Sequence, residues 1–340
     1  MKILSYVPDI NIHNRAGACR YCLTAVKEYS KYDVTLCGVD DVEEYNFNDF
    51  DIIHTQSFHN KFLTNFKSKM IYGMHGFGFS CPPGGHYCMV LNNFLKEPLT
   101  CLDCLGYLGL KTGGYNLNKC LELARKSDRI SVDSIFMKEF YHCYNPLLLP
   151  LPLETDILKP CSIEEKEDYI FYTGRLSFEK NPHGFLDIIN RTGLRGKMVV
   201  YDTVEDIMGT KNQYSDILNS NNKNIEIILN PTKEKMIELV RHARFTVLPY
   251  FFAEPFGVAA ANSVLCGTPL VAFPYGNVRN MTHILPKTLD EMIKVLEMGD
   301  EQYLNNLKIT MKRSNELRQL HDPKNAIRIW DEAYENLMVK

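Results

Sequence analysis

Short apolar runs recur along the first half of the chain, and each one stops at a polar, glycine or proline residue. The spans between them are long enough for helices. The runs cover residues 2–7, 33–37, 51–55 and 70–76. Continuous apolar runs of this length are consistent with buried strands of a parallel sheet, which helices cover on both faces. Strands that alternate with helical spans predict a doubly wound α/β sheet.

The same alternation returns in the second half. Its apolar runs cover residues 168–174, 197–201, 225–229, 245–250 and 270–273. Between the halves, residues 146–160 are punctuated by prolines and read as extended chain, so we expect a hinge near residues 150–168. A chain of 340 residues is too long for one comfortable core and fits two α/β domains of ~150 residues each.

Composition and charge narrow the function classes. The chain is 45% hydrophobic and 23% charged, its formal net charge is -3, and it has no long lysine or arginine run. A nucleic-acid partner is therefore unlikely. The amino-terminal residues lack the form of a signal peptide, and no apolar run approaches the ~18 residues of a membrane span. We expect a cytoplasmic protein with no transmembrane segment, whose membrane contact would be peripheral at most.

The stretch from Glu254 to Phe273 carries the strongest local signal. It places an acid on a loop, then a helix of small residues from Gly257, a stop at Gly267 and Pro269, and an apolar run. Because a strand-like run precedes Glu254, the acid would lie beyond the carboxyl end of a strand, where open α/β sheets bind ligands. The free amides and partial positive charge of the helix N-terminus suit a phosphate. The alternative is an ordinary helix with a glutamate at its start.

This stretch resembles the donor-binding signature of the retaining nucleotide-sugar glycosyltransferases with the GT-B fold, the family-four or group 1 enzymes. In that signature two glutamates separated by seven residues bracket the helix start. Here Glu254 holds the first position and Asn262 the second. The resemblance implies that Glu254 binds the donor, with the backbone at Phe256, Gly257 and Val258. Asn262 would hold the ribose, although an amide lacks the charge of a carboxylate.

A second motif follows the strand that ends at Gly174. Arg175 enters the loop and Lys180 precedes the next helix. A departing diphosphate needs such a positive clamp where no metal neutralises it. The resemblance assigns Gly174, Arg175 and Lys180 to the donor pyrophosphate, with no catalytic metal. Two solvated basic residues on a loop are the alternative.

Four further positions have weaker signals. His75 ends a strand between glycines, and the resemblance implies a place near the transferred sugar. Gly17 lies in the first strand-to-helix loop. In the family this loop lies beneath the donor phosphates. Asn230 and Thr232 lie in the loop that in this fold borders the nucleotide base. A structural histidine and a plain turn explain His75 and Gly17 without a site.

The cysteines are unusually clustered. Of eleven cysteines, four fall within one stretch: Cys81, Cys88, Cys101 and Cys104. The Cys-x-x-Cys pair at 101–104 suits a tetrahedral zinc ion, and Cys81 with Cys88 or His86 would complete it. A structural zinc site, disulfides and free thiols all remain open, and we expect a rigid flap beside the acceptor site.

The resemblance covers nearly the whole chain. It implies two Rossmann-like domains facing each other across a cleft: an N-terminal acceptor domain at 1–155 with the cysteine-rich insertion at about 76–120, and a C-terminal donor domain at 156–320. A terminal helix at 321–340 would pack back on the N-terminal domain, with Trp330 as its anchor.

The function expected from these residues is transfer of a hexosyl or pentosyl group. The donor would be a nucleoside-diphosphate sugar, UDP- or GDP-linked, and the acceptor a hydroxyl of a glycan, a lipid-linked sugar or another molecule. The anomeric configuration would be retained, with His75, Glu254, Arg175 and Lys180 at the reacting centre. The alternatives are a nucleotide-sugar epimerase on the same fold and an inactive sugar- or nucleotide-binding module.

Overall fold

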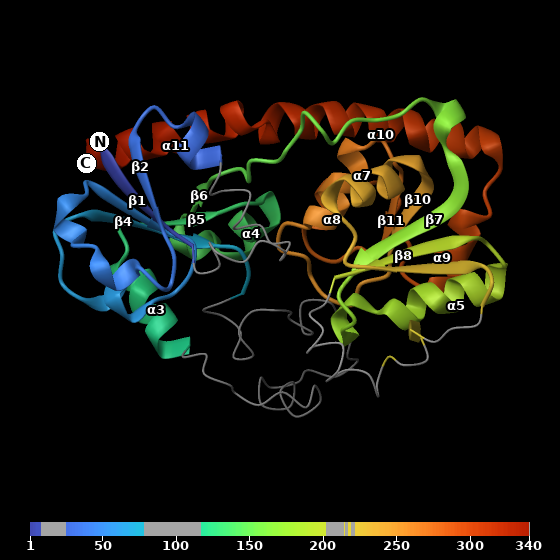
Figure 1. Ribbon diagram of the computed structural model, residues 1–340, viewed down its shortest axis with the longest axis horizontal. Coiled ribbons are helices and arrows are strands. Elements are labelled where there is room, and N and C mark those ends of the chain that lie inside the picture. The colour runs from blue at the N-terminus through green and yellow to red at the C-terminus, as the bar shows by residue number, and fades with distance from the viewer. Residues whose placement is uncertain (8–24, 78–116, 202–213, 215–216, 219–221, 340) are drawn as a thin grey trace. The chain divides into compact units, whose positions relative to one another are not determined.

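The chain folds into two compact units (Figure 1). The computed structural model describes residues 1–7, 25–77, 117–201, 214, 217–218 and 222–339. Unit 1 comprises Met1–Glu154 and Gln319–Lys340, and unit 2 comprises Thr155–Arg318. The second domain was expected at residues 156–320, so unit 2 begins one residue earlier and ends two residues earlier than expected.

Unit 1 is built on a parallel sheet of six strands in the order β2-β1-β3-β4-β5-β6. The strands are β1 (Lys2–Tyr6), β2 (Asp33–Cys37), β3 (Ile52–Thr55), β4 (Lys69–Met74), β5 (Arg129–Val132) and β6 (Leu147–Leu148). Its described helices include α3 (Leu117–Lys126), α4 (Ile135–Phe140) and α11 (Pro323–Met338).

Unit 2 is built on a parallel sheet of five strands in the order β11-β10-β7-β8-β9. The strands are β7 (Glu167–Gly174), β8 (Gly196–Val200), β9 (Ile225–Leu229), β10 (Ala243–Leu248) and β11 (Leu270–Ala272). Its helices include α5 (Pro182–Thr192), α7 (Lys233–His242), α8 (Val258–Leu265), α9 (Leu289–Leu296) and α10 (Asp300–His321), whose last residues belong to unit 1.

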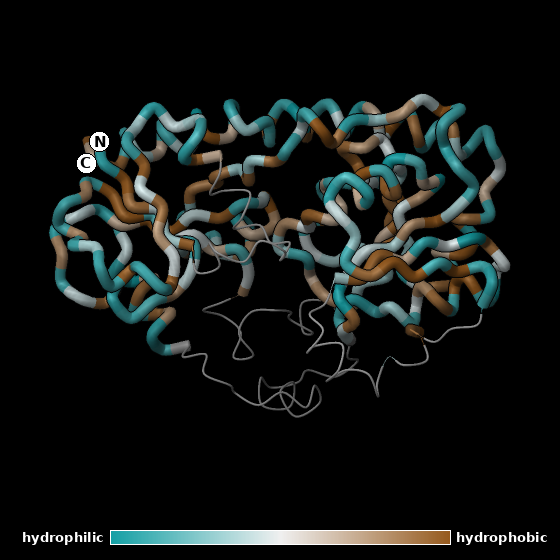
Figure 2. Tube along the Cα trace, in the orientation of Figure 1, coloured by the Kyte–Doolittle hydropathy of each residue, from teal (hydrophilic) through white to brown (hydrophobic). Residues whose placement is uncertain are grey.

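The hydrophobic pattern explains both sheets. The central strand β3 and the edge strand β11 are both buried at every residue, as expected where helices cover both faces. Figure 2 shows the apolar residues concentrated along the strands and the polar ones along the outer helices. The expected α/β class with two Rossmann-like units is thereby observed. No helix in the described part of the chain has the length and apolarity to cross a bilayer.

Helix α11 is fastened to the sheet of unit 1 by buried polar contacts. Trp330 is 2% exposed, and its indole Nε1 donates to the carbonyl of Pro150 at 3.0 Å. The Tyr334 hydroxyl lies 2.8 Å from Nδ1 of His54, a fully buried residue of β3. Asp331 accepts from the Ser30 hydroxyl at 2.6 Å. Segments about 300 residues apart in sequence therefore share one core.

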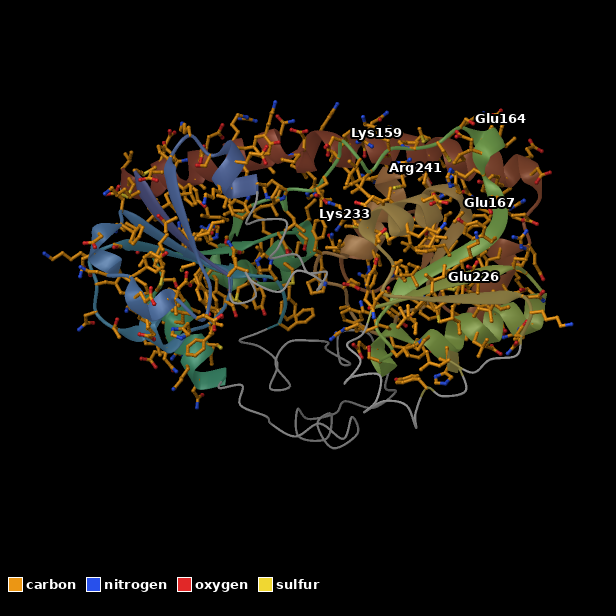
Figure 3. All side chains as sticks on the ribbon, in the orientation of Figure 1. Lys159, Glu164, Glu167, Glu226, Lys233 and Arg241 are labelled. Carbon is orange, nitrogen blue, oxygen red and sulfur yellow. The ribbon has the colours of Figure 1, made fainter. Side chains whose placement is uncertain are left out.

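In unit 2 the segment that follows residue 155 is held by two arginines. The guanidinium of Arg241, near the end of α7, donates to the carbonyls of Ile157 at 2.7 Å and Lys159 at 2.8 Å (Figure 3). Arg318 on α10 donates to the carbonyl of Leu158 at 2.7 Å. Because an arginine fork can satisfy several carbonyls at once, this extended segment needs no secondary structure of its own.

The buried histidine on β3 predicts acid sensitivity. Burial, aided by the neighbouring His75, lowers the pKa of His54 from 6.5 to about 3. Below pH 6.5 His54 is therefore protonated in the unfolded chain but stays neutral in the folded chain. The free energy of unfolding then falls as the pH drops from 6.5 towards 3. Between pH 7 and pH 5 we expect His54 to cost about 2 kcal/mol of unfolding free energy.

Urea unfolding at pH 7 and pH 5 measures this loss. The His54→Gln variant should lose about 2 kcal/mol less than the wild type between these two values. His142→Gln, a change at an exposed histidine, should keep the full loss. An equal loss in all three proteins would show that His54 is not the responsible group.

Candidate functional site

The expected donor-binding residues of unit 2 follow the ends of its strands. Arg175 follows β7, Asn230 follows β9, and Glu254 lies six residues after β10. Because all five strands are parallel, their carboxyl ends lie at one edge of the sheet. Strands β7 and β10 are neighbours, which brings the loops after them together.

Lys180 and Glu254 form an ion pair at this edge. The distance from Lys180 Nζ to Glu254 Oε1 is 2.5 Å, and the two side chains are only 15% and 12% exposed. The ammonium also lies 4.1 Å from the ring centre of Tyr250 and 4.3 Å from that of Phe252. An ammonium held by a carboxylate and two aromatic faces has little freedom to move, so this cation is pre-positioned.

Backbone contacts fix Lys180 from its own side. The residues Phe178–Lys180 form a short 3-10 turn, and the carbonyl of Lys180 accepts from the Tyr172 hydroxyl at 3.1 Å. The next residue, Asn181, has a positive φ of 47° and caps α5 by accepting from the Gly184 amide. Its side-chain amide donates to the carbonyl of Pro249 at 2.9 Å, which ties this turn to the loop after β10.

Glu254 is fixed from the other side by the segment after β11. Glu254 and Gly276 form an isolated parallel bridge, and the amide of Asn277 donates to the Glu254 carbonyl at 2.8 Å. The side chain of Asn277 donates to the carbonyl of Phe256 at 2.9 Å. Gly276 has a φ of 73°, and a Cβ there would collide with the backbone of Glu254, so only glycine permits this approach.

Helix α8 begins directly after this loop. Its N-cap is Gly257, with a φ of 90° and no side-chain cap, and Val258 is its first residue. Helix N-termini without a side-chain cap leave amide donors for another acceptor. Asn262, one turn further along, is 6% exposed, and its Oδ1 has no hydrogen-bond partner among the described residues. A buried acceptor without a donor is costly, so this oxygen is suited to a ligand hydroxyl.

Arg175 is less firmly placed than Lys180. Its side chain is 54% exposed, and its Nη2 lies 3.4 Å from Oε1 of Glu179, not against Glu254. Glu179 is buried and also accepts from the Ser177 hydroxyl at 2.7 Å. The structure thus brings Lys180 and Glu254 together, while Arg175 stands on the same turn with its own acidic partner.

Gly174 ends β7 beneath two tyrosines. A Cβ on Gly174 would lie 2.9 Å from the Tyr172 hydroxyl and 3.2 Å from that of Tyr250. Burial raises the pKa of Tyr250 well above its usual value, and its hydroxyl donates to the carbonyl of Thr173. Gly174 therefore makes room for the tyrosine that supports Lys180.

Asn230 and Thr232 lie at the same edge, after β9. Asn230 has a φ of 45°, and its amide donates to the Val200 carbonyl at 2.9 Å. Thr232 caps α7 by accepting from the Lys235 amide at 3.2 Å. Both side chains are exposed, as a site open to a ligand requires.

His75 belongs to unit 1 and follows β4. Its Nδ1 lies 2.9 Å from Oδ2 of Asp133 and its Nε2 lies 2.6 Å from Oε1 of Gln56. The imidazole is 16% exposed. Its glycine neighbours were the signal in the sequence, whereas Gln56 and Asp133 were not recognised as its partners. The spacing offered one clue, since Gln56 and Asp133 also come directly after strands.

Several expected site residues lie outside the described part of the chain: Gly17, Cys81, Cys88, Cys101 and Cys104. Among the residues that the structure does describe, no group of three or more His, Cys, Asp or Glu side chains could hold a metal ion. The aromatic supports Tyr250 and Phe252 were missed by the sequence reading, because each looks like an ordinary core residue.

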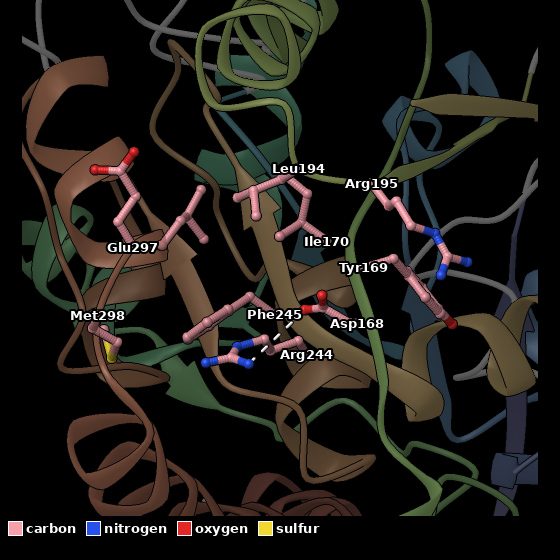
Figure 4. A pocket seen from close by; sticks show the side chains of 10 residues that line it. Asp168, Tyr169, Ile170, Leu194, Arg195, Arg244, Phe245, Glu297 and Met298 are labelled. Carbon is pink, nitrogen blue, oxygen red and sulfur yellow. Dashed lines mark ion pairs between the residues drawn. The ribbon is translucent and has the colours of Figure 1, made fainter. Parts of the chain in front are cut away.

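A cavity of about 200 Å³ lies elsewhere in unit 2 (Figure 4). It is lined by residues at the starts of β7, β8 and β10, including Asp168, Arg195 and Arg244. Arg244 lies 3.9 Å from the carboxylate of Asp168. Because these are the amino ends of parallel strands, the cavity is at the edge opposite Lys180 and Glu254, and it is separate from the candidate donor site.

Comparison with known proteins identifies a family over part of the chain. Residues 154–283 match the family model described as Glycosyl transferases group 1, a stretch that contains both basic positions, Glu254 and Asn262. The match confirms the family resemblance that these residues carry in the sequence. No curated protein is significantly similar to the chain in sequence.

Solved structures share the fold over the full chain. Sucrose-phosphate synthase from Thermosynechococcus elongatus has a TM-score of 0.71 at 11% identity, covering 99% of both chains. Anabaena Alr3699/HepE in complex with UDP and glucose has a TM-score of 0.67 at 13% identity, covering 100% of both. The catalytic domain of starch synthase IV from Arabidopsis thaliana, bound to ADP and acarbose, has a TM-score of 0.61 at 9% identity, covering 99% of both. The expected GT-B fold class is confirmed.

The close approach at Gly276 yields a stability prediction. Gly276→Ala should lower the free energy of unfolding by about 2–6 kcal/mol, because backbone strain and overpacking add, each costing about 1–3 kcal/mol. Gly193→Ala is the matched control. Gly193 has a φ of 71° but nothing within 4 Å of its Cβ position, so only the strain of about 1–2 kcal/mol applies.

Chemical denaturation of the two variants tests the difference. Equal losses for Gly276→Ala and Gly193→Ala would mean that the bridge to Glu254 does not constrain the loop.

Proposed function

Taking the group 1 glycosyltransferase domain at residues 154–283 as the premise, we propose that the protein transfers a sugar from a nucleoside-diphosphate sugar to a hydroxyl acceptor. The donor is UDP- or GDP-linked, the transferred group is a hexose or pentose, and the anomeric configuration is retained. The UDP and glucose in the Anabaena complex and the ADP in the starch synthase complex support a donor of this class.

The observation that carries the proposal is the Lys180–Glu254 contact of 2.5 Å beside the start of α8. A nucleoside-diphosphate sugar presents an anionic diphosphate next to sugar hydroxyls. A cation and an acid held side by side match that alternation, because the ammonium donates to phosphate oxygens and the carboxylate accepts from hydroxyls. The amides of Gly257 and Val258 add neutral donors for the phosphate.

The remaining residues complete the donor site. Arg175 is half-exposed on the same turn and swings from Glu179 to the diphosphate. The free Oδ1 of Asn262 accepts from a ribose hydroxyl. Asn230 and Thr232, at the end of β9 and the start of α7, border the nucleotide base.

Catalysis then depends on meeting the charge of the leaving diphosphate. Lys180 and Arg175 supply positive charge at that point, so no metal ion is required. The departing phosphate itself takes the proton of the acceptor hydroxyl, and the sugar is attacked on the face that it leaves, which retains its configuration. The family resemblance implies a role for His75 near the reacting sugar. The acceptor is a glycan, a lipid-linked sugar or another hydroxyl compound.

Removal of the ammonium is the direct test. Lys180→Ala should lower kcat/KM for sugar transfer by about 10²–10³-fold, the range seen when one donor to a developing negative charge is deleted. Transfer, hydrolysis and epimer formation are measured with UDP-, GDP- and ADP-sugars, with and without EDTA, and the configuration of the product is read by NMR.

Lys197→Ala is the control for this test. Lys197 lies near the start of β8 and pairs with Glu167 at 3.4 Å, at the edge of the sheet opposite the site, so activity should be unchanged. Donor binding with no turnover on any acceptor would favour a binding module, and a product with altered sugar stereochemistry and no transfer would favour an epimerase. Either result overturns the proposal.

The orphan oxygen of Asn262 gives a second test. Asn262→Ala should weaken the binding of free UDP or GDP by about 3–10-fold, which corresponds to the loss of one hydrogen bond of about 0.5–1.5 kcal/mol. Asn262→Glu should bind the nucleotide at least as tightly as the wild type, because a carboxylate accepts more strongly. Calorimetry measures both, and unchanged affinity in Asn262→Ala would remove this residue from the ribose site.

A further inference from the structure

Three neighbouring strands of unit 1 end in one polar cluster. Gln56, His75 and Asp133 directly follow β3, β4 and β5, and these strands are adjacent in the sheet. Two residues before each member, on the same side of its strand, stand His54, Gly73 and Ser131. The cluster therefore has an outer row at the carboxyl edge and an inner row beneath it.

Polar contacts continue beneath this edge and across β4. His54 and Ser131 belong to strands that β4 separates, yet His54 Nε2 lies 3.3 Å from the Ser131 hydroxyl. Gly73 is the register partner of Ser131. A Cβ on Gly73 would collide with Oε1 of Gln56. Gly73 thus leaves the space in which the Gln56 amide lies.

Gln56 contacts both histidines, with its amide oxygen facing one and its amide nitrogen facing the other. It is 5% exposed, its Oε1 lies 2.6 Å from His75 Nε2, and its Nε2 lies 3.1 Å from His54 Nε2. In the orientation that the Gln56 amide has in the structure, its oxygen accepts from His75 Nε2, which then carries a hydrogen, and its nitrogen donates to His54 Nε2, which then carries none. The His54 hydrogen is then on Nδ1, which donates to the Tyr334 hydroxyl at 2.8 Å.

The second nitrogen of His75 is also protonated. Its Nδ1 lies 2.9 Å from the carboxylate of Asp133, which is 3% exposed. Imidazole is the stronger base of this pair by about 2–3 units of ordinary pKa, so the proton between them belongs to the ring. With a hydrogen on each nitrogen, His75 is an imidazolium.

We propose that Gln56 is a positioning residue that holds His75 as a doubly protonated cation at the carboxyl edge of the unit 1 sheet. The catalytic use of this charge rests on the proposed function. A cation with no free lone pair cannot remove a proton from the acceptor, so His75 would act by charge and hydrogen bonding on an anionic or hydroxyl-bearing substrate. The titratable groups in its described surroundings include Asp133, the neutral His54 and Tyr141, whose hydroxyl donates to the Gly76 carbonyl. His321 also lies within electrostatic range of the Asp133 carboxylate.

The protonation of His75 can be measured without any substrate. In ¹⁵N-histidine-labelled protein, both ring nitrogens of His75 should carry hydrogens at pH 7, with the signals assigned by their loss in His75→Asn. Gln56→Met removes the acceptor at similar volume and should shift the titration midpoint of His75 down by about one pH unit, a tenfold loss of proton affinity. Gln56→Glu restores an acceptor and should return the midpoint to at least the wild-type value.

Two further variants keep the result interpretable. Gly73→Ala displaces the amide without removing a polar group and should shift the His75 midpoint in the same direction as Gln56→Met. Gln319→Met, at an exposed glutamine of unit 1, should leave it unchanged. A single ring hydrogen on His75 in the wild type at pH 7, or an unshifted midpoint in Gln56→Met, overturns the proposal.

Turnover separates this inference from the proposed function. If sugar transfer occurs, Gln56→Met should lower kcat about tenfold at pH 7.5 with little change in KM, and Gln56→Glu should recover it. Doubly protonated His75 in a protein that transfers no sugar would refute the proposed function alone. Transfer by a protein in which His75 carries one hydrogen would refute this inference alone.

Discussion

The contact between Lys180 and Glu254 organises the candidate site of unit 2. Two opposite charges that are nearly removed from water attract strongly, yet each pays a desolvation cost, so such a pair persists only where the surroundings hold both partners. Here the surroundings do so: Tyr250 and Phe252 hold the ammonium, while Gly276 and Asn277 hold the backbone that carries the acid. The Lys180–Glu254 pair is therefore a fixed, largely buried feature of the sheet edge, unlike an ion pair between mobile surface side chains.

This arrangement explains why the loops around the site are rich in unusual backbone. Asn181, Asn230, Gly257 and Gly276 all have positive φ values, and each is found where the chain leaves a strand or enters a helix. Left-handed backbone costs energy for most residues and is tolerated where the surrounding contacts determine it. The loops therefore turn sharply enough to place side chains and amides together at the carboxyl edge of the sheet.

In unit 1 buried hydrogen bonds position the polar side chains at the edge of the sheet. Its buried network passes from Tyr334 through His54 and Gln56 to His75 and Asp133, so helix α11 is connected to the edge of the sheet by hydrogen bonds. A buried network of this kind fixes both ring orientation and protonation. Within it, Oδ1 of Asp133 has no hydrogen-bond partner among the described residues. Burial and the neighbouring His75 lower the pKa of His54, so the positive charge proposed for His75 and a neutral His54 are consistent with each other.

The sequence by itself determined most of the strands, their alternation with helices, the fold class and the family signature around Glu254 and Lys180, because periodicity and turn residues are local properties. It did not determine that Glu254 pairs with Lys180 while Arg175 pairs with Glu179, or that Gln56 joins two histidines. Lys180 and Glu254, for example, are 74 residues apart in the sequence. The order of the strands in the sheet decides which loops meet. Because β7 lies beside β10, the loop that carries Lys180 meets the loop that carries Glu254.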